Sequence, residues 1–269
     1  MTSETATLAP VLYIPHGGGP LPLLGDPAHR QLVGFWESIP RSLGTPSAIV
    51  LISAHWEEEL PTLTGGIHPE LLYDYYGFPP ESYQIKYPAP GAPFLAKRIH
   101  TLLTEGGLQS RLDDHRGFDH GLFIPLKIMY PKADIPCVQL SLLSSLDPKA
   151  HIAIGKALAP LRQENVLIIG SGFSFHNLRA FFTSPPGVPD QQNEVFNQWL
   201  IDTCTDDALS TDEREERLAT WTSAPNARYC HPREEHLLPL HVCFGIAQTK
   251  ARLVFNGEVL GKRACAFLW

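Results

Sequence analysis

The stretch Ala48-Ile-Val-Leu-Ile-Ser-Ala-His55-Trp56 is the strongest indication of fold class in this sequence. Its first residues are almost all aliphatic, and they follow the turn-forming run Gly44-Thr-Pro-Ser47. A short continuous apolar run of this kind is typical of a strand buried on both faces of a parallel sheet. Open α/β sheets bind their ligands at the carboxyl ends of the strands. We therefore expect His55, at the end of this strand, to lie where the chemistry takes place.

Further strands alternate along the chain with amphipathic helices. The pattern predicts strands at 11–15, 48–54, 134–141 and 164–170, helices at 26–38, 94–104, 147–161, 191–207 and 211–220, and closing antiparallel strands at 252–256 and 263–269. The pair Asp147-Pro148 is typical of a helix start, with aspartate as the cap and proline in the first turn. This order of elements indicates an α/β protein.

Length and composition narrow the class of protein. The 269 residues form one expected domain, 1–269, and the net charge of −7 with scattered Lys and Arg argues against nucleic acid as a partner. Residues 1–7 show neither a basic segment nor an apolar leader, and no later apolar run approaches the length of a bilayer span. We expect a cytoplasmic protein without membrane association. Five dispersed cysteines with no Cys-x-x-Cys indicate neither a disulfide framework nor a zinc ribbon.

Histidines follow three of the predicted strands. His16 follows the first and opens the loop His16-Gly-Gly-Gly-Pro20, His55 ends the second, and His176 follows the strand at 164–170. The glycines permit close approach of a bound group, but the loop lacks the Lys-Ser/Thr ending of a phosphate loop. His16 is therefore the candidate ligand, with a plain turn residue as the alternative.

Two further segments contribute candidates. His120 lies at an element boundary in Asp119-His120-Gly121, where Asp119 either caps a helix or orients the imidazole. The segment His231-Pro-Arg-Glu-Glu-His236 is expected to begin a helix. If these segments converge, imidazoles without thiolates form an open catalytic site for Zn(II) or Fe(II). Neighbours on a helix project about 100° apart, so one of Glu235 and His236 ligates, and the spacing leaves both open.

A loop rich in aromatic residues follows the His55 strand. It is stiffened by prolines and either walls a pocket for an aromatic substrate or packs over the sheet. Its aromatic and histidine side chains are His68, Tyr73, Tyr75, Tyr76, Phe78 and Tyr87.

Several of these motifs, taken together, resemble the 4,5-DOPA extradiol dioxygenase-like family of the class III extradiol ring-cleavage dioxygenases. They occur in the order found in the family and cover nearly the whole chain. The matching pieces are His16-Gly-Gly-Gly-Pro20, Ser53-Ala-His-Trp-Glu57, Tyr76-Gly-Phe-Pro79, Tyr87-Pro-Ala-Pro-Gly-Ala-Pro93, Gly117-Phe-Asp-His-Gly121, Pro136-Cys-Val-Gln-Leu140, Gly170-Ser-Gly-Phe-Ser-Phe-His-Asn-Leu178 and Glu235-His-Leu-Leu-Pro-Leu240.

The resemblance implies a three-layer α/β/α sandwich with a central mixed, mostly parallel sheet. It also implies one metal ion bound by His16, His55 and His236, with His176 as a fourth metal-proximal histidine or a catalytic base. His120 corresponds to an active-site histidine that helps hold substrate and dioxygen. Fe(II) is the metal implied for activity, and Zn(II) is expected to compete for the site in purified protein because zinc binds more tightly.

The implied reaction is extradiol ring cleavage of a catechol, DOPA-like or related, by dioxygen to a muconic semialdehyde. Gly18-Gly19 and Phe123 replace residues common in the family, and Phe175 is bulkier than expected, so the resemblance does not carry DOPA over as the substrate. Phe123, Phe175, Tyr76 and His231 are the candidate substrate contacts.

Two other functions fit the same residues. An all-histidine site with an open position also serves a zinc-dependent hydrolase, with Glu57 or Glu235 as base and with activity that survives without oxygen. A non-catalytic binding protein on the same scaffold would have no accessible cavity for an aromatic ring. The sequence does not indicate an oligomeric state.

Overall fold

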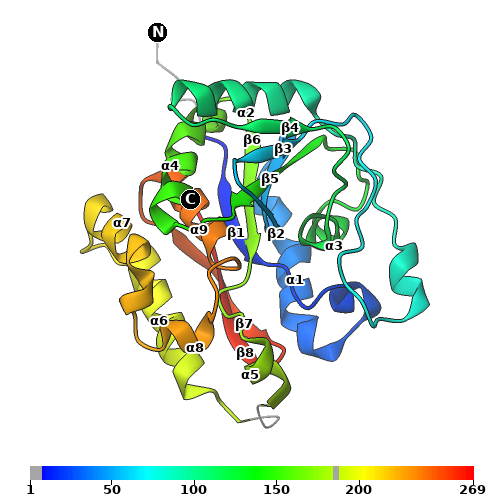
Figure 1. Cartoon of the computed structure of the whole chain (residues 1–269). Helices are drawn as coiled ribbons and strands as arrows, with labels where there is room; N and C mark the ends of the chain where they lie inside the picture. The colour runs from blue at the N-terminus through cyan, green and yellow to red at the C-terminus, as the bar shows by residue number, and fades with distance from the viewer. Residues whose placement is uncertain (1–7, 184–187) are drawn as a thin grey trace.

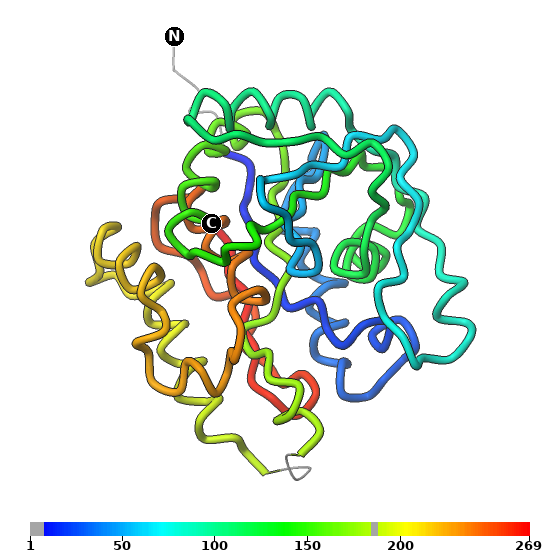
Figure 2. The backbone as a smooth tube through the Cα atoms, viewed as in Figure 1, coloured from blue at the N-terminus to red at the C-terminus, as the bar shows by residue number. Residues whose placement is uncertain are grey.

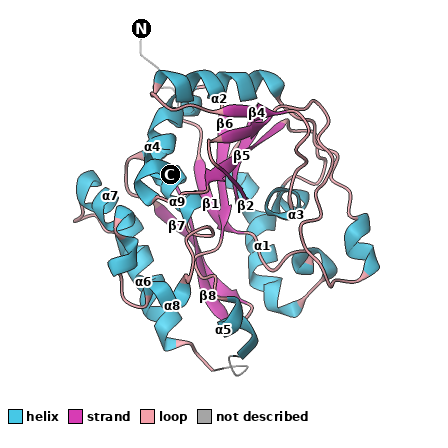
Figure 3. Ribbon diagram, in the orientation of Figure 1, coloured by secondary structure: helices cyan, strands magenta, loops and turns pink. Residues whose placement is uncertain are grey.

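An eight-stranded mixed sheet runs through the centre of the computed structural model, which describes residues 8–183 and 188–269 (Figure 1, Figure 3). The strand order is β4-β3-β5-β2-β6-β1-β8-β7. The strands are β1 (Val11–Pro15), β2 (Ala48–Glu58), β3 (Thr62–Thr64), β4 (Arg111–Asp113), β5 (Cys137–Leu143), β6 (Val166–Gly172), β7 (Arg252–Val259) and β8 (Lys262–Leu268).

The four central strands, β5, β2, β6 and β1, are parallel to one another. β8 pairs antiparallel with both β1 and β7, so strands from near the two ends of the chain lie side by side, as the blue and red traces in Figure 2 show. The predicted antiparallel closing pair is confirmed. Because parallel strands end at one edge, the residues that follow β1 and β6 are brought together there.

Helices cover both faces of the sheet and form a three-layer α/β/α sandwich, as expected (Figure 1). α1 (Arg30–Ser38) and α3 (His120–Met129) pack together on one face, and α4 (Pro148–Leu158) and α9 (Leu238–Ala247) pack on the other. The remaining helices are α2 (Pro93–Glu105), α5 (Leu178–Thr183), α6 (Gln191–Thr205), α7 (Thr211–Ala219) and α8 (Ala227–Cys230), with 3₁₀ turns η1 (Leu21–Leu24), η2 (Pro27–His29), η3 (Ile39–Ser42), η4 (Pro80–Gln84), η5 (Ala159–Gln163) and η6 (Trp221–Ser223).

Three local predictions differ from the structure. The helix expected from residue 26 begins as η2 and becomes α-helical only at Arg30. β2 continues past His55 to Glu58, but its pairing with β5 shifts register between Ile52 and Glu57 and its pairing with β6 stops at Ser53. His55 therefore lies in an irregular stretch of the strand, beyond its regular pairing.

The segment 231–236 does not start a helix, which corrects the third prediction. It consists of turns between α8 and α9. His231 has φ −130° and ψ 87° because the ring of Pro232 disfavours helical backbone at the preceding residue. The argument that Glu235 and His236 project from a helix therefore does not apply.

Two further expectations concern residues that the structure does not describe. The sequence also favours a loop at 183–189, of which residues 184–187 lie outside the described residues. The expectation for the amino terminus concerns residues 1–7, which lie outside them as well. Within 8–183 and 188–269, no helix combines the length and apolar character needed to cross a bilayer.

The buried imidazole of His151 in α4 makes stability depend on pH. Its Nε2 accepts the backbone N–H of Leu143 at 3.1 Å, and its Nδ1 donates to the carbonyl of Asp147 at 2.7 Å. Burial lowers the pKa of His151 to about 4. The unfolded chain therefore binds more protons below the ordinary pKa of 6.5, and stability present above that pH is lost as the pH falls toward 4.

We expect His151 to account for a loss of about 2 kcal/mol between pH 7.5 and pH 5. Urea unfolding at the two pH values measures it, with His151→Gln as the comparison because its amide keeps an acceptor for Leu143. The pH dependence of the variant should be weaker than that of the wild type by this amount. Equal pH dependence in both proteins would contradict the assignment.

Candidate active site

Three histidines from distant parts of the chain meet at the carboxyl edge of the sheet. One ring nitrogen of each of His16, His55 and His236 lies within 4.8 Å of the others. The Nε2 atoms of His16 and His55 are 3.0 Å apart, and the ring centroids of His16 and His236 are 5.1 Å apart. The structure thus brings together the three residues that the family resemblance implies as metal ligands.

The backbone around β6 explains why these rings reach one point. His16 follows β1 directly, and its backbone N–H donates to the carbonyl of Gly172 at 3.0 Å. The carbonyl of His236 accepts the N–H of Phe173 at 2.9 Å. A Cβ on Gly172 would lie 2.1 Å from that carbonyl oxygen, so only glycine lets residue 236 approach β6 this closely.

Each of the three rings has a partner on its Nδ1 side. Ser171 Oγ donates to the carbonyl of Gly121 at 2.6 Å and lies 3.2 Å from His16 Nδ1, so it accepts from that nitrogen. His236 Nδ1 lies 2.9 Å from Glu235 Oε1, and His55 Nδ1 lies 3.6 Å from Asp74 Oδ2. The partners of His16 and His236 fix the tautomer and leave Nε2 as the free lone pair, as in metal-binding histidines. For His55 the distance exceeds that of a hydrogen bond, and the Asp74 carboxylate only attracts a proton to the Nδ1 side.

The donor set therefore fits a divalent metal ion. Burial, followed by neighbouring charges, holds the pKa of His16, His55 and His236 well below the ordinary value, so the rings are neutral, the form that binds metal. The Nε2 atoms of His16 and His55, 3.0 Å apart, either share a hydrogen bond or, when both carry lone pairs, repel each other unless a cation lies between them. Three neutral imidazoles without a thiolate are ligands that suit zinc and Fe(II).

His120 lies beside this cluster and is held by Asp74. The centroids of the His55 and His120 rings are 4.0 Å apart. Asp74 Oδ1 accepts from the backbone N–H of His120 at 3.0 Å and lies 2.8 Å from its Nδ1. Burial alone would raise the pKa of Asp74, but its hydrogen bonds and the charges of the histidines lower it to about 2. Asp119 caps α3 by accepting from Gly121 N–H at 3.0 Å, so Asp74, not Asp119, orients His120.

Glu235 joins His176 to His236. Its Oε1 lies 3.1 Å from His176 Nδ1 and 2.9 Å from His236 Nδ1, and the two rings stack with centroids 3.3 Å apart. Its Oε2 lies 3.4 Å from Arg233 Nη1, which also pairs with Glu57 at 2.5 Å. Glu235 therefore lies on the Nδ1 side of both histidines. His176 forms a candidate metal group with Glu235 and His236, whereas His16 and His55 form another with His236.

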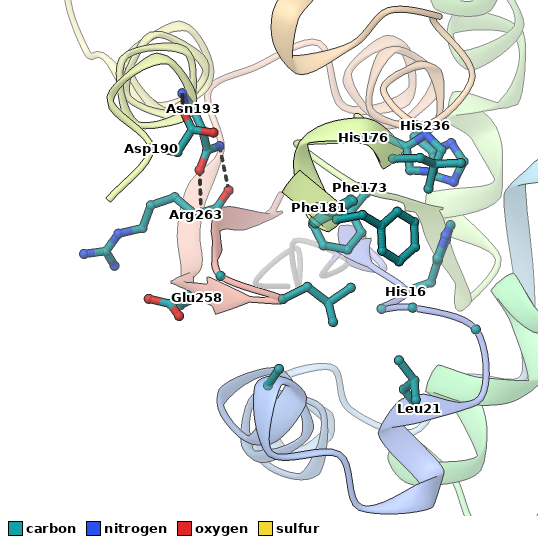
Figure 4. Close-up of a pocket in the computed structure, with 18 of the residues that line it drawn as sticks. His16, Leu21, Phe173, His176, Phe181, Asp190, Asn193, His236, Glu258 and Arg263 are labelled. Carbon is teal, nitrogen blue, oxygen red and sulfur yellow. Dashed lines mark hydrogen bonds between the residues drawn. The ribbon is translucent and has the colours of Figure 1, made fainter. Parts of the chain in front are cut away.

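A cavity of 1050 Å³ opens onto these rings (Figure 4). His16, His176 and His236 lie at one end of it, Phe173 and Phe181 lie in the middle, and charged residues lie at the other end. His55 and His120 also line the cavity. The expectation attached to a non-catalytic scaffold, that no cavity would admit an aromatic ring, is therefore not met.

The four candidate substrate contacts lie elsewhere. Tyr76 is 91% exposed, while Phe123, Phe175 and His231 are fully buried, and none of the four lines the cavity. Phe123 packs against Tyr73 and Tyr75, Phe175 against Phe181 and Tyr229, and His231 against Phe196 and Trp221. This placement does not support direct contact with substrate, because each ring is either in the core or turned to solvent.

Neighbouring residues line the cavity instead, and two of them belong to the aromatic loop that the sequence offers as a pocket wall. Tyr75 and Phe78 of the aromatic loop line the cavity, as does Phe173, which lies two positions before Phe175. The carboxylate of Asp74 lies near two histidines, His55 and His120. Its position between tyrosines of the aromatic loop is the feature of the sequence that could have identified it as a site residue. In loops, side-chain direction has no fixed period, so a one-residue displacement cannot be recognised from sequence alone.

The fold and the site define a class: an α/β/α sandwich with a histidine-lined cavity and a candidate metal site at the carboxyl edge of its sheet. Comparison with known proteins makes the assignment more specific. The chain belongs to the family described as "Catalytic LigB subunit of aromatic ring-opening dioxygenase", which matches residues 11–266. It is thus a member of a family of oxygenases that open aromatic rings, which confirms the resemblance found in the sequence.

Individual relatives agree with this assignment. The protein named "Dioxygenase tasH" of Hapsidospora irregularis is 42% identical, over 97% of this chain and 86% of the relative. The "4,5-DOPA dioxygenase extradiol" of Beta vulgaris is 42% identical, over 91% of this chain and 90% of the relative. The crystal structure of the uncharacterized protein JW3007 from Escherichia coli K12 superposes with a TM-score of 0.77 at 31% identity, covering 97% of this chain and 99% of that one.

Proposed function

We propose that the protein cleaves the ring of a catechol next to its two hydroxyl groups, incorporates both atoms of dioxygen, and releases a muconic semialdehyde. The observation that carries this proposal is the cluster of three neutral imidazoles, His16, His55 and His236, at the end of a cavity that also presents His120 and His176. Phe173 and Tyr75 line the same cavity and offer aromatic surfaces against which a dihydroxybenzene ring can pack.

His176 is proposed as the base that removes a phenolic proton. Its Nδ1 is held by Glu235, so its Nε2 is left as the acceptor and its ring lines the cavity. Glu235 also stabilises the imidazolium that forms when the proton arrives, because a carboxylate next to the ring favours the charged form. Glu235 therefore acts through His176 and His236.

His120 is proposed to hold the opposite side of the substrate. Asp74 accepts on its Nδ1 side, which turns the other nitrogen toward the cavity beside His55. From there His120 donates a hydrogen bond to an oxygen atom of the reacting ligands or returns a proton to it. Positioned imidazoles of this kind typically contribute about 10²–10⁴-fold to a rate.

The residues His16, His55 and His236 are proposed to hold the metal. Fe(II) bound there supplies the electron transfer between catechol and dioxygen that side chains cannot perform. Zn(II) suits the same three nitrogens and binds more tightly, so purified protein is expected to require reloading with Fe(II) under reducing conditions. The protein is proposed to act in the cytoplasm as the single domain 1–269.

The test is oxygen consumption by Fe(II)-reconstituted protein with catechol and 4-substituted catechols, followed with an oxygen electrode and by the absorbance of a yellow product. We expect uptake of one dioxygen per catechol consumed. His176→Ala should lower turnover by at least about 10²-fold without a change in metal content. Metal-loaded protein that consumes no oxygen with any catechol would refute the proposal.

The zinc hydrolase alternative differs in its need for oxygen. Zn(II)-loaded protein that hydrolyses esters or amides under strict anaerobiosis, while the Fe(II)-loaded form takes up no oxygen, would favour it. The assay is informative because both reactions would use the same imidazoles.

A further inference from the structure

The cavity is much larger than the ring that the proposed reaction opens. Its 1050 Å³ lies just above the roughly 300–1,000 Å³ found for pockets that hold drug-sized ligands. A bare dihydroxybenzene is far smaller and would occupy only the histidine end. The rest of the cavity extends toward the β7–β8 hairpin and α6, as Figure 4 shows. This space is available to a substituent on the ring.

The mouth of the cavity exposes apolar side chains. Leu178, Phe182 and Val188 line the cavity and are 59%, 85% and 57% exposed, respectively. Large apolar side chains gathered at a cavity mouth typically mark a surface that an apolar ligand covers. Phe181 also lines the cavity and lies between its charged end and its histidines (Figure 4).

Leu260 has an unusual backbone conformation at this wall. It occupies the first position of the two-residue turn Leu260-Gly261 between β7 and β8, with φ +54°. Asparagine, aspartate or glycine is preferred at such a position, and leucine there is strained. Leu260 nevertheless lines the cavity, and its Cδ1 would lie only 3.1 Å from a Cβ on Gly18. A strained residue that faces a cavity points to a functional role for its side chain.

The charged end of the cavity disfavours an anionic substituent. Arg263 is the single lysine or arginine among the described residues that line the cavity, and its Nε lies 3.7 Å from Glu194 Oε1. Asp190, Glu194 and Glu258 line the same end. Asp190 is paired with Lys262, so a carboxylate on the substrate would meet two cations that already have acidic partners, together with the further negative charge of Glu258.

We infer that the substrate is a catechol that carries an uncharged, apolar substituent of several carbons, and that Leu260 with Leu178 and Phe181 forms the subsite for it. This inference rests on the proposed ring cleavage and adds the chemical class of the substituent. Each methylene group that the subsite buries lowers the free energy of the bound state enough to raise kcat/KM several-fold. Leu260 is therefore a specificity-determining residue.

A matched pair of substrates tests the substituent. 4-Butylcatechol and 4-(3-carboxypropyl)catechol have chains of equal length and differ in the terminal methyl or carboxylate. We expect kcat/KM of the wild type to favour the butyl compound by at least about tenfold, and to favour it over catechol by a similar factor. Equal values, or a preference for the carboxylate, would overturn the inference.

Leu260→Asn tests the residue without endangering the fold, because asparagine suits the turn better than leucine. We expect its melting temperature to equal or exceed that of the wild type, while the ratio of kcat/KM for 4-butylcatechol to that for catechol falls roughly tenfold. Leu146→Asn is the matched control, since Leu146 also has positive φ, at 51°, and does not line the cavity. An unchanged ratio in Leu260→Asn would remove Leu260 from the subsite.

Anaerobic calorimetry with the metal-loaded protein separates this inference from the proposed reaction, because it measures binding without turnover. Preferential binding of 4-butylcatechol without any later cleavage in air would refute the ring-cleavage function and support the apolar subsite. Cleavage of all three catechols without preference would support the function and refute the subsite.

Discussion

Replacing His16 with alanine is expected to lower bound iron below one tenth of an equivalent and to reduce ring-cleaving turnover by more than about 100-fold. Loss of a residue that merely orients a metal ligand typically costs about 10–100-fold in affinity or activity, so loss of a ligand should exceed that range. His16 lies close to both other histidines of the cluster, since its ring centroid lies 4.7 Å from that of His55 and 5.1 Å from that of His236. Metal analysis after desalting and oxygen uptake measure the two effects.

The matched control for His16→Ala is His115→Ala. His115 is exposed and lies outside the candidate metal groups of the described residues. We expect this variant to retain metal and turnover at the wild-type level. If His16→Ala bound a full equivalent of iron while remaining folded, the assignment of the metal site to His16, His55 and His236 would be wrong.

Gly155→Ala is expected to destabilise the fold by about 3 kcal/mol, a large share of the roughly 5–15 kcal/mol typical of folded domains. Gly155 lies where α4 crosses α9. A Cβ there would be 2.2 Å from the carbonyl oxygen of Val242 and 2.8 Å from the Cα of Gly245. Both are backbone atoms, so the two helices must separate to admit the methyl group. Chemical unfolding at neutral pH measures the loss.

Gly34→Ala provides the matched control, because it is the same substitution inside a helix. Gly34 lies on the exposed side of α1, and a Cβ there would meet no atom within 4 Å. Alanine has a higher helix propensity than glycine by about 1 kcal/mol, so we expect this variant to be stabilised by up to that amount. Equal effects of the two substitutions would show that the contact between α4 and α9 is not close.

Local sequence patterns predict an element correctly where the residues of that element determine its structure. The apolar run in β2, the first strand at 11–15 and the Asp147-Pro148 helix start were all found correctly, because burial and capping leave direct signatures. The positions of His16 and His55 at the carboxyl edge of the sheet follow from the same strands. His236 was correctly grouped with them, although its segment was wrongly expected to begin a helix.

Sequence patterns therefore predict the α/β architecture and the edge of the sheet at which the histidines gather. Tertiary structure alone decided which loop side chains face the cavity: Tyr75 and not Tyr76, Phe173 and not Phe175, and Asp74 as the partner of His120. The physical reason is that strand and helix periods are set by backbone hydrogen bonds between near neighbours or regular partners, whereas the direction of a loop side chain is set by packing against residues far away in the chain.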